Sequence, residues 1–351
     1  MKISEWHDSE EEKKEIMNLT SKTYGNSEVA ESSYYDWLYR MNPQGKPLLI
    51  LATDEKNNHA IIGIEPIIPM KLFVGESVIM SSLSCNSAVN PHYRGKGIFS
   101  NLVSSMVDEA IKKRFSSIYG IPNKNSYDIF KKQGFIEVTR LPLLVRPLKL
   151  SHYFDSPLRS LLQPFDSIWK ISSNNNTEIQ LLRDEYSEDF DVLTVKASKR
   201  IQVIQKRDKE FLNWRYKNHP TRDYQTYVLK ENSILRGYII TRETVIKGKT
   251  IGIVVDFLVD SDTKNKEKLK DLVRAALGNF WKKSVSVVIA TCRAGLLEYE
   301  ILRKMGFFVV PEFLKPEPLY FIVMALDNSL ILNKLKLFDN WFFSFGDYDV
   351  F

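Results

Sequence analysis

A weak internal repeat constrains the fold of this chain more than any other feature of its sequence. The segment WLYRMNP at 37–43 parallels WRYKNHP at 214–220, and KQGF at 132–135 parallels KMGF at 304–307. In both halves the tryptophan precedes the Gly-Phe pair by roughly 95 residues. Two such landmarks at one spacing predict a duplicated domain.

Length and local pattern together set the expected domain boundaries. A chain of 351 residues is longer than one average domain. The stretch between the halves contains two prolines and the run SSNNN, which is typical of a connector. We therefore expect a first domain at 1–149, a linker at 150–177, a second domain at 178–326 and an apolar tail at 327–351.

Hydrophobic periodicity predicts the same order of elements in both halves. Apolar residues recur every three or four positions over 98–111, which indicates a long amphipathic helix. Shorter apolar runs predict strands around it, and a strand–helix–strand order requires a crossover between parallel strands. The expected fold is an α/β protein with a mixed (α+β) sheet in each domain. The predicted strands lie at 48–53, 60–69, 77–89, 117–121, 135–145, 225–229, 234–241, 250–259 and 285–291, and the main helices at 98–112, 126–132, 266–282 and 296–305.

The segment 87–99 carries the clearest chemical signal. A strand ends there, a loop with Gly95 and Gly97 follows, and the amphipathic helix begins. Glycine lets the backbone approach a ligand closely, and a helix N-terminus offers unpaired N–H groups to an anion. Arg94 and Lys96 add positive charge. The segment is suited to a pyrophosphate, although an ordinary strand-to-helix turn with a basic surface would have the same pattern.

This loop resembles motif A of the GNAT acyltransferases, which reads Gln/Arg-x-x-Gly-x-Gly/Ala. Here it reads Arg94-x-x-Gly97-x-Phe99, and the phenylalanine departs from the small residue of the family. The segments GIPNKNS at 120–126 and FKKQGF at 130–135 are similar to the family's later motif. The resemblance covers residues 1–148 directly.

The second half resembles the family only as a degenerate copy. The loop after its central strand, 260–266, reads DSDTKNK and contains neither glycine nor Arg-x-x-Gly. We therefore expect tandem GNAT-like domains of which the second lacks the coenzyme-binding loop.

The resemblance implies that the co-substrate is acyl-CoA. In this family an amine attacks the thioester carbonyl directly, the pantetheine arm bonds to the strand before the loop, and the pyrophosphate lies on the loop and the helix start. Carried over to this sequence, the cofactor-binding residues are Ser87, Ala88, Val89, Arg94, Gly95, Lys96, Gly97, Ile98, Phe99, Asn125 and Phe130.

The catalytic groups are less clear from the sequence. The family often has a tyrosine general acid at the position of Phe130, which cannot donate a proton. Tyr127, one helical turn earlier, is the candidate acid, or else a partly buried aromatic. Glu65 is the candidate base, or else a solvent-facing strand carboxylate. Cys85 is interpreted as a core thiol and His92 as a surface residue.

The acceptor is expected to be a small amine. Tandem length and the ending Gly-Asp-x-Asp resemble N-acyltransferases that act on nucleotide-linked (dTDP-type) amino sugars in surface-polysaccharide biosynthesis. Asp256 and Asp347 are the candidate acceptor-binding residues. The apolar tail is interpreted as packed on the body, with an interfacial membrane segment as the alternative. An antibiotic or polyamine acceptor, or a non-catalytic acyl-CoA-binding module, stays open.

Composition limits the remaining possibilities. The net charge is +6, but the basic residues are interleaved with acidic ones and form no long basic block. Nucleic acid is therefore not an expected partner. Two cysteines without metal-ligand spacing predict neither disulfides nor a metal site. The polar start of the chain and the lack of a long apolar run predict a cytoplasmic protein without membrane insertion. The oligomeric state is not predicted.

Overall fold

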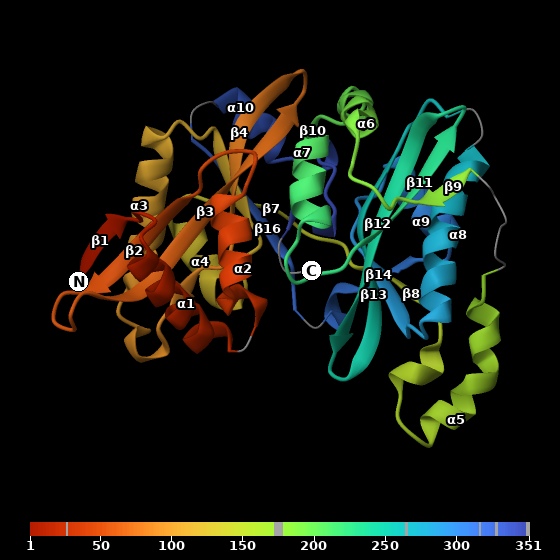
Figure 1. Ribbon diagram of the computed structural model, residues 1–351, viewed down its shortest axis with the longest axis horizontal. Coiled ribbons are helices and arrows are strands. Elements are labelled where there is room, and N and C mark those ends of the chain that lie inside the picture. The colour runs from red at the N-terminus through yellow and green to blue at the C-terminus, as the bar shows by residue number, and fades with distance from the viewer. Residues whose placement is uncertain (26, 172–177, 264–265, 316, 327–328, 349–351) are drawn as a thin grey trace. The chain divides into compact units, whose positions relative to one another are not determined.

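The computed structural model describes residues 1–25, 27–171, 178–263, 266–315, 317–326 and 329–348 (Figure 1). The chain forms two compact units. The first unit contains residues 1–140, 210–221 and 317–340, and the second contains 141–209, 222–316 and 341–351. Each unit therefore consists of three separate stretches of chain. Each also has its own mixed sheet.

The sheet of the first unit is antiparallel except at one step. Its strand order is β1-β2-β3-β4-β6-β16-β7. Of the described pairs in this order, β4 and β6 are the parallel one, and the short β5 pairs with β3 beyond the end of β4. The bounds are β1 (Lys2–Glu5), β2 (Leu48–Asp54), β3 (Ala60–Val74), β4 (Ser77–Ser84), β5 (Ala88–Val89), β6 (Ser117–Gly120), β7 (Ile136–Arg140) and β16 (Tyr320–Ala325).

Helix α3 (Ile98–Lys112) is the main helix of the first unit, as its periodicity predicts. Its apolar face, including Leu102 and Met106, is fully buried and packs on β2 and β3. Gly63 on β3 permits this contact, because a Cβ atom there would lie 2.9 Å from Leu102 Cδ1. The other α-helices of the unit among the described residues are α1 (Glu10–Tyr24), α2 (Ser32–Tyr35), α4 (Lys124–Lys132), α7 (Lys209–Leu212) and α10 (Ser329–Leu335).

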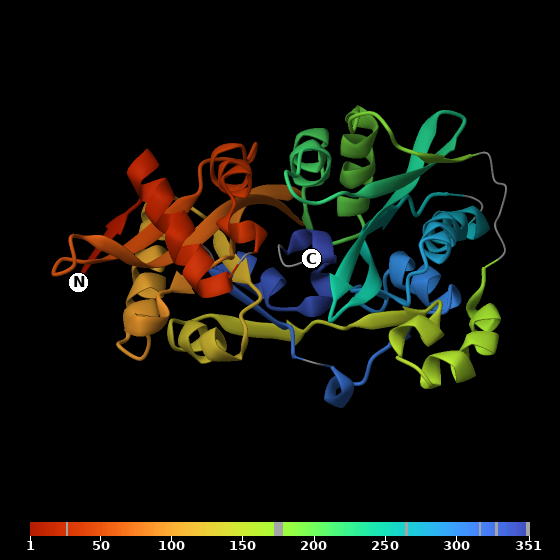
Figure 2. The same ribbon diagram turned by 60° about the horizontal axis from the view of Figure 1, so that its bottom comes forward.

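The sheet of the second unit repeats this plan. Its order is β15-β8-β14-β13-β12-β11-β9, and only β13 and β14 are parallel. The strands are β8 (Leu144–Pro147), β9 (Ile179–Leu181), β11 (Gln225–Glu231), β12 (Ile234–Ile246), β13 (Lys249–Val259), β14 (Val287–Ala290) and β15 (Phe308–Val309). The helices are α5 (Leu158–Leu162), α6 (Glu188–Ser198), α8 (Lys266–Lys282) and α9 (Leu297–Lys304), and the long β12–β13 hairpin is clear in Figure 2.

The two sheets therefore correspond strand by strand. The series β2-β3-β4-β6 with α3 matches β11-β12-β13-β14 with α8. This confirms the predicted mixed α/β class with two similar units. The region 135–145, predicted as one strand, is instead β7 in the first sheet and the start of β8 in the second. On the side away from β4, β6 pairs with β16, which comes from the C-terminal part of the chain.

The repeated tryptophans meet inside the first unit. Trp37 and Trp214 stack with ring centroids 4.8 Å apart and planes 14° apart. Trp37 Nε1 donates to the Trp214 carbonyl at 2.8 Å, and Trp214 Nε1 donates to the Trp37 carbonyl at 2.9 Å. Each lies in a single π-helical turn, Asp36–Arg40 or Asn213–Lys217. The reciprocal contact explains why both copies of the repeat keep a tryptophan at this place.

Candidate functional site

The first unit opens its sheet where β4 ends. β4 and β6 pair as far as Ser84 and Gly120, and no further pairing between them is found in the described residues. The chain then bulges through 85–87, with Asn86 at a positive φ of 57°, before β5 pairs with β3. Where two strands part after a bulge, their backbone N–H and C=O groups no longer pair with each other. We call this place, beyond Ser84 and Gly120, the gap. This is the place where the sequence predicts the pantetheine arm, at Ser87, Ala88 and Val89.

The glycine loop follows the bulge and begins α3. Gly97 is the N-cap residue in the left-handed conformation, with φ 73°, and no side chain caps the helix. A Cβ atom built on Gly97 or Gly95 would meet nothing within 4 Å, so the space beside the loop is open. The first-turn N–H groups of Ile98, Phe99 and Ser100 are not capped and have no hydrogen-bond partner among the described residues, at the positive end of the helix.

Two cations flank this helix start. Arg94 and Lys96 are exposed, and neither makes an ion pair with any residue that the structure describes. Lys96 Nζ lies 4.9 Å above the Tyr93 ring, which is held by a 2.8 Å hydrogen bond from Tyr93 to Asp54. Uncapped N–H groups beside two cations without an ion pair are features that favour the binding of an anion.

Glu65 lies on β3, next to the bulge, and its side chain does not reach solvent. Ser84 Oγ donates to Glu65 Oε1 at 2.6 Å, while Oε2 has no hydrogen-bond partner among the described residues. Burial raises the pKa of Glu65 to about 7, and the hydroxyls of Ser84 and the nearby Ser87 lower it less. A carboxyl group with this pKa exchanges a proton at neutral pH, which is what a general base requires.

Sequence reasoning missed a second group at the bulge, Tyr24. It is the last residue of α1, and its hydroxyl donates to the carbonyl of Ser87. Although Tyr24 as a whole is 40% exposed, burial of its phenol end raises the pKa of Tyr24, and the nearby Glu65 and Cys85 raise it further. Nothing in the local sequence distinguishes Tyr24, because the contact joins residues 63 positions apart.

The residues predicted on α4 take different places. Asn125 is exposed at the helix start, and its N–H donates to Oδ1 of Asn123, which is the N-cap residue. Phe130, predicted to contact the coenzyme, is buried in the core between Phe99 and Phe135. Tyr127 stacks on Tyr320 with ring centroids 4.2 Å apart.

The hydroxyl of Tyr127 donates to the Glu137 carboxylate. This hydrogen bond is the main reason that the pKa of Tyr127 is raised to about 12. The phenol keeps its proton at neutral pH, as a general acid must, but it releases that proton less readily than an ordinary tyrosine.

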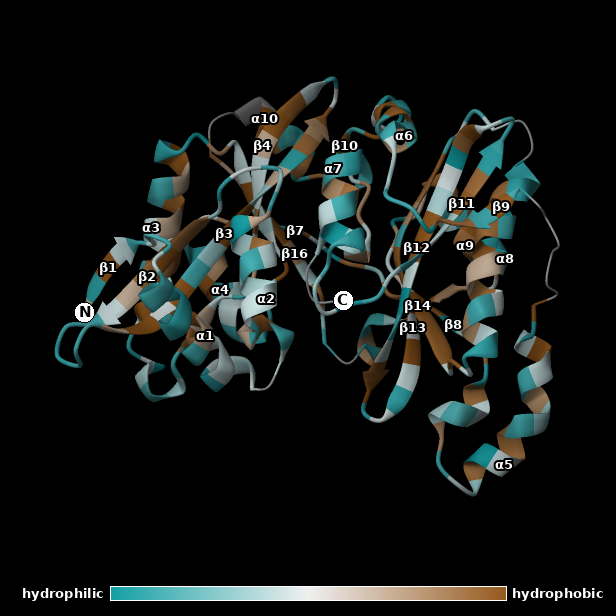
Figure 3. Ribbon diagram, viewed as in Figure 1, coloured by the Kyte–Doolittle hydropathy of each residue, from teal (hydrophilic) through white to brown (hydrophobic). Residues whose placement is uncertain are grey.

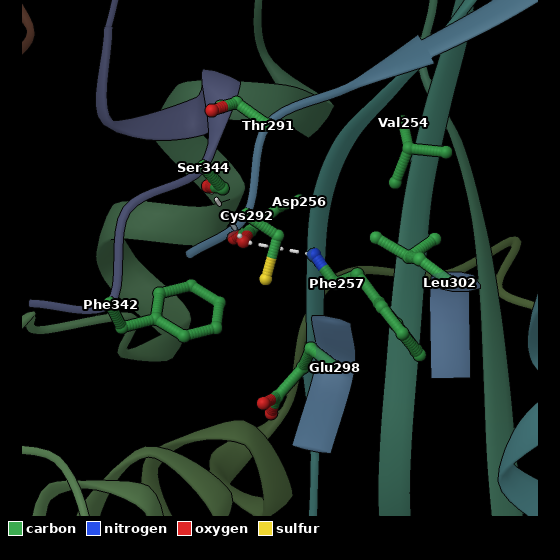
Figure 4. A pocket seen from close by; sticks show the side chains of 9 residues that line it. All are labelled: Val254, Asp256, Phe257, Thr291, Cys292, Glu298, Leu302, Phe342 and Ser344. Carbon is green, nitrogen blue, oxygen red and sulfur yellow. Dashed lines mark hydrogen bonds between the residues drawn. The ribbon is translucent and has the colours of Figure 1, made fainter. Parts of the chain in front are cut away.

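In the second unit the corresponding gap is closed. β13 and β14 pair as far as Ile253 and Ile289, and β13 has an irregularity at the step between Val254 and Asp256. The gap beyond is reduced to a small pocket into which the tail inserts Phe342 and Ser344 (Figure 4). The pocket is lined by Val254, Asp256, Phe257, Thr291, Cys292, Glu298, Leu302, Phe342 and Ser344.

A buried ionic network holds the tail in this gap. Arg207 Nε donates to Asp256 at 2.8 Å, and another Arg207 nitrogen donates to Asp347 at 2.6 Å. Ser344 Oγ donates to Asp256 at 3.0 Å, and Tyr238 donates to the same carboxylate at 3.0 Å. All of these side chains are buried. Asp256 and Asp347, predicted to bind the acceptor, both pair with Arg207 in this network.

Comparison with known proteins agrees with the geometry of the first unit. Residues 7–137 match the family model described as acetyltransferase (GNAT) domain. The match lies within the first unit and includes the bulge at 85–87 and the start of α3. The match agrees with the enzyme class predicted from the sequence, an acyl-CoA-dependent N-acyltransferase. A search of curated proteins gives no significant match.

Several solved structures share the fold over nearly the whole chain. A GCN5-related N-acetyltransferase from Anabaena variabilis is 13% identical, with a TM-score of 0.65 over 93% of this chain and 73% of that one. A probable N-acyltransferase from Enterococcus faecalis is 12% identical, with a TM-score of 0.61 and the same coverage. Saccharomyces cerevisiae N-myristoyltransferase with bound myristoyl-CoA is 14% identical, with a TM-score of 0.63 over 92% of this chain and 82% of that one.

No described helix has the length and apolar character needed to cross a membrane. No cluster of three His, Cys, Asp or Glu side chains with metal-binding geometry occurs among the described residues.

Proposed function

We propose that this protein transfers an acyl group from acyl-CoA to the amino group of a small acceptor, with the chemistry in the first unit. The observation that supports this most is the uncapped start of α3 at Gly97, next to the bulge at 85–87. The diphosphate of the coenzyme would lie on the N–H groups of 98–100 beside Arg94 and Lys96. The pantetheine arm would follow Ser87, Ala88 and Val89 to the gap.

The proposed reaction uses Glu65 as the base. The ammonium group of the acceptor loses a proton to Glu65 through the Ser84 hydroxyl, which already donates to Glu65 Oε1. The free amine attacks the thioester carbonyl carbon, the C–S bond breaks, and the amide forms. The attacking nitrogen loses its second proton as the amide forms, and the coenzyme leaves as a thiolate that takes up one proton. The net reaction releases one proton, which Glu65 passes to solvent, so charge and atoms balance.

Tyr127 remains the candidate source of that last proton, and its removal tests this role. Replacing Tyr127 with phenylalanine keeps the ring on Tyr320 but removes the hydroxyl. If the phenol is the acid, we expect kcat to fall by roughly tenfold or more, with little change in KM for acyl-CoA. Thiol release measures both constants. Full activity in Tyr127→Phe would assign the proton to solvent.

For the acceptor we propose a nucleotide-linked amino sugar of the dTDP type, as the sequence resemblance implies. Its diphosphate suits a chain with net charge +6, and its base suits an aromatic-rich protein. The alternatives are an antibiotic or a polyamine, and a module that binds acyl-CoA without turnover.

The acceptor is tested by thiol release from acetyl-CoA with a panel of amines. We expect turnover with a dTDP-linked amino sugar and only background release with spermidine or an aminoglycoside. The matched control is the same nucleotide sugar with a hydroxyl in place of the amine. Turnover with the polyamine alone would reject the sugar assignment, and coenzyme binding without release for any amine would favour the non-catalytic module.

A further inference from the structure

The second unit presents an apolar stripe outward on the segment that follows β8. The stripe consists of Leu158, Leu161, Phe165 and Ile168, whose side chains are 50%, 66%, 56% and 71% exposed. Their spacing of three, four and three positions places them on one face of α5 and the following 3-10 helix (Gln163–Trp169). Hydrophobic residues recur along α5 in Figure 3. Clustered exposed apolar side chains of this size mark an interaction surface.

Polar contacts on the inner side fix this segment with the stripe outward. The N–H and hydroxyl of Ser151 donate to the buried carboxylate of Asp166 at 3.0 and 2.6 Å. Arg146 donates to the Trp169 carbonyl at 3.2 Å and lies 5.9 Å above its ring. The usual arrangement of a surface helix is therefore inverted, because polar groups face the unit and large apolar groups face away from it.

The charges around the stripe are positive. Arg159 and Lys170 belong to the same segment, and neither forms an ion pair with a residue that the structure describes. Both acidic groups of 150–170 are occupied: Asp166 is buried, and Asp155 pairs with Lys249 at 2.5 Å. No acidic side chain of this segment is thus left to balance Arg159 and Lys170.

The Asp155–Lys249 pair also joins the turn of the β12–β13 hairpin to this surface. The end of β12 before that turn carries Val245 and Ile246, which are 68% and 43% exposed, and the exposed Lys247 follows in the turn. A second element thus offers the same combination of apolar and basic side chains next to the stripe.

We propose that this surface docks on an anionic lipid bilayer. A basic element with Leu, Ile and Phe on its outer face suits the boundary between anionic headgroups and acyl chains. Pairing with a second copy of this chain is less suited to it, because a two-fold contact would bring Arg159 and Lys170 of both copies together. The tail, considered above as an interfacial segment, is not involved, since Trp341 and Phe342 are buried in the second unit.

Co-sedimentation with vesicles tests the proposal, whatever the acyltransferase activity proves to be. The full chain is mixed with vesicles of phosphatidylcholine and phosphatidylglycerol or of phosphatidylcholine alone. We expect binding to the anionic vesicles that weakens with added salt. The triple variant Leu161→Ser, Phe165→Ser and Ile168→Ser should lose on the order of tenfold or more in partitioning. The double variant Arg159→Gln and Lys170→Gln should bind less tightly and lose most of the salt dependence.

The matched control is the double variant Phe313→Ser and Leu314→Ser. These side chains are 84% and 63% exposed in the same unit, so the control also removes exposed apolar surface, but outside the stripe. It should bind vesicles like the unaltered protein, and all variants should keep the same melting temperature. Absence of binding by the unaltered chain, or equal loss in the control and the triple variant, would overturn the proposal. So would a dimer in solution that only the triple variant abolishes, because the stripe would then be a self-association surface.

Discussion

Replacing Gly97 with aspartate is expected to abolish measurable binding of desulfo-CoA while the protein stays folded. Gly97 is the N-cap residue of α3, and an introduced carboxylate there can accept hydrogen bonds from the first-turn N–H groups. The helix would be capped, but the donors proposed for the diphosphate would be occupied and a negative charge would face it. Each charge-assisted bond is worth about 1.5–3 kcal/mol, so loss of two lowers affinity by at least about a hundredfold. Titration calorimetry measures the effect.

Gly248→Asp provides a closely matched control. Gly248 has the same φ of 73° as Gly97, and a Cβ atom there likewise meets nothing within 4 Å. The two substitutions therefore introduce the same carboxylate into the same backbone conformation, with the same strain. Gly248 lies in the turn between β12 and β13, so affinity for desulfo-CoA should be unchanged. Unchanged affinity in Gly97→Asp as well would remove the coenzyme site from this helix start.

Local pattern was sufficient to predict the coenzyme-side elements. The glycines at 95 and 97 and the apolar spacing of 98–111 determine the loop and α3 without reference to distant residues, and the structure begins α3 at Ile98 as expected. The same holds for α8, predicted at 266–282 and described as Lys266–Lys282. Signals within one turn of a helix can be interpreted from the sequence because the interactions that form them are local.

The exchange of strands between the sheets could not be predicted in this way. Apolar residues continue from β7 into β8. Their spacing does not indicate that the chain leaves one sheet and enters the other at this point. Ile322 in β16 pairs with Gly120 in β6, about two hundred positions away along the chain. A partner at that distance leaves no mark on the local sequence.

The partners of the charged side chains in the tail and at the bulge could not be predicted either, because they too are distant in the sequence. Asp256 and Asp347 were predicted to bind the acceptor, and the local sequence does not show that both pair with Arg207, which lies 49 and 140 positions away along the chain. Glu65 offered two alternatives, since a carboxylate on a strand can face either solvent or core. Its complete burial excludes the solvent-facing alternative, and its role as the base stays a prediction.

Replacing Glu65 with glutamine is expected to lower kcat on the order of a hundredfold or more, because general base catalysis contributes about that much. The amide keeps the size of the carboxyl group and can still accept from Ser84, so the fold and KM for acyl-CoA should change little. In the unaltered protein the base acts when deprotonated, and its pKa is about 7. Activity should therefore rise with pH through about 7 and level off above it, and this limb should vanish in Glu65→Gln.

Ser84→Ala separates a catalytic role of Glu65 from a merely structural one. The Ser84 hydroxyl lowers the pKa of Glu65, so its removal should move the acidic limb of the pH–rate profile to higher pH. It should also lower kcat at neutral pH, since the proposed path of the proton runs through this hydroxyl. A structural carboxyl group would change melting temperature in both variants and leave the position of the limb unchanged. If Glu65→Gln keeps both full kcat and the limb, another group or a chain of waters takes the proton from the amine.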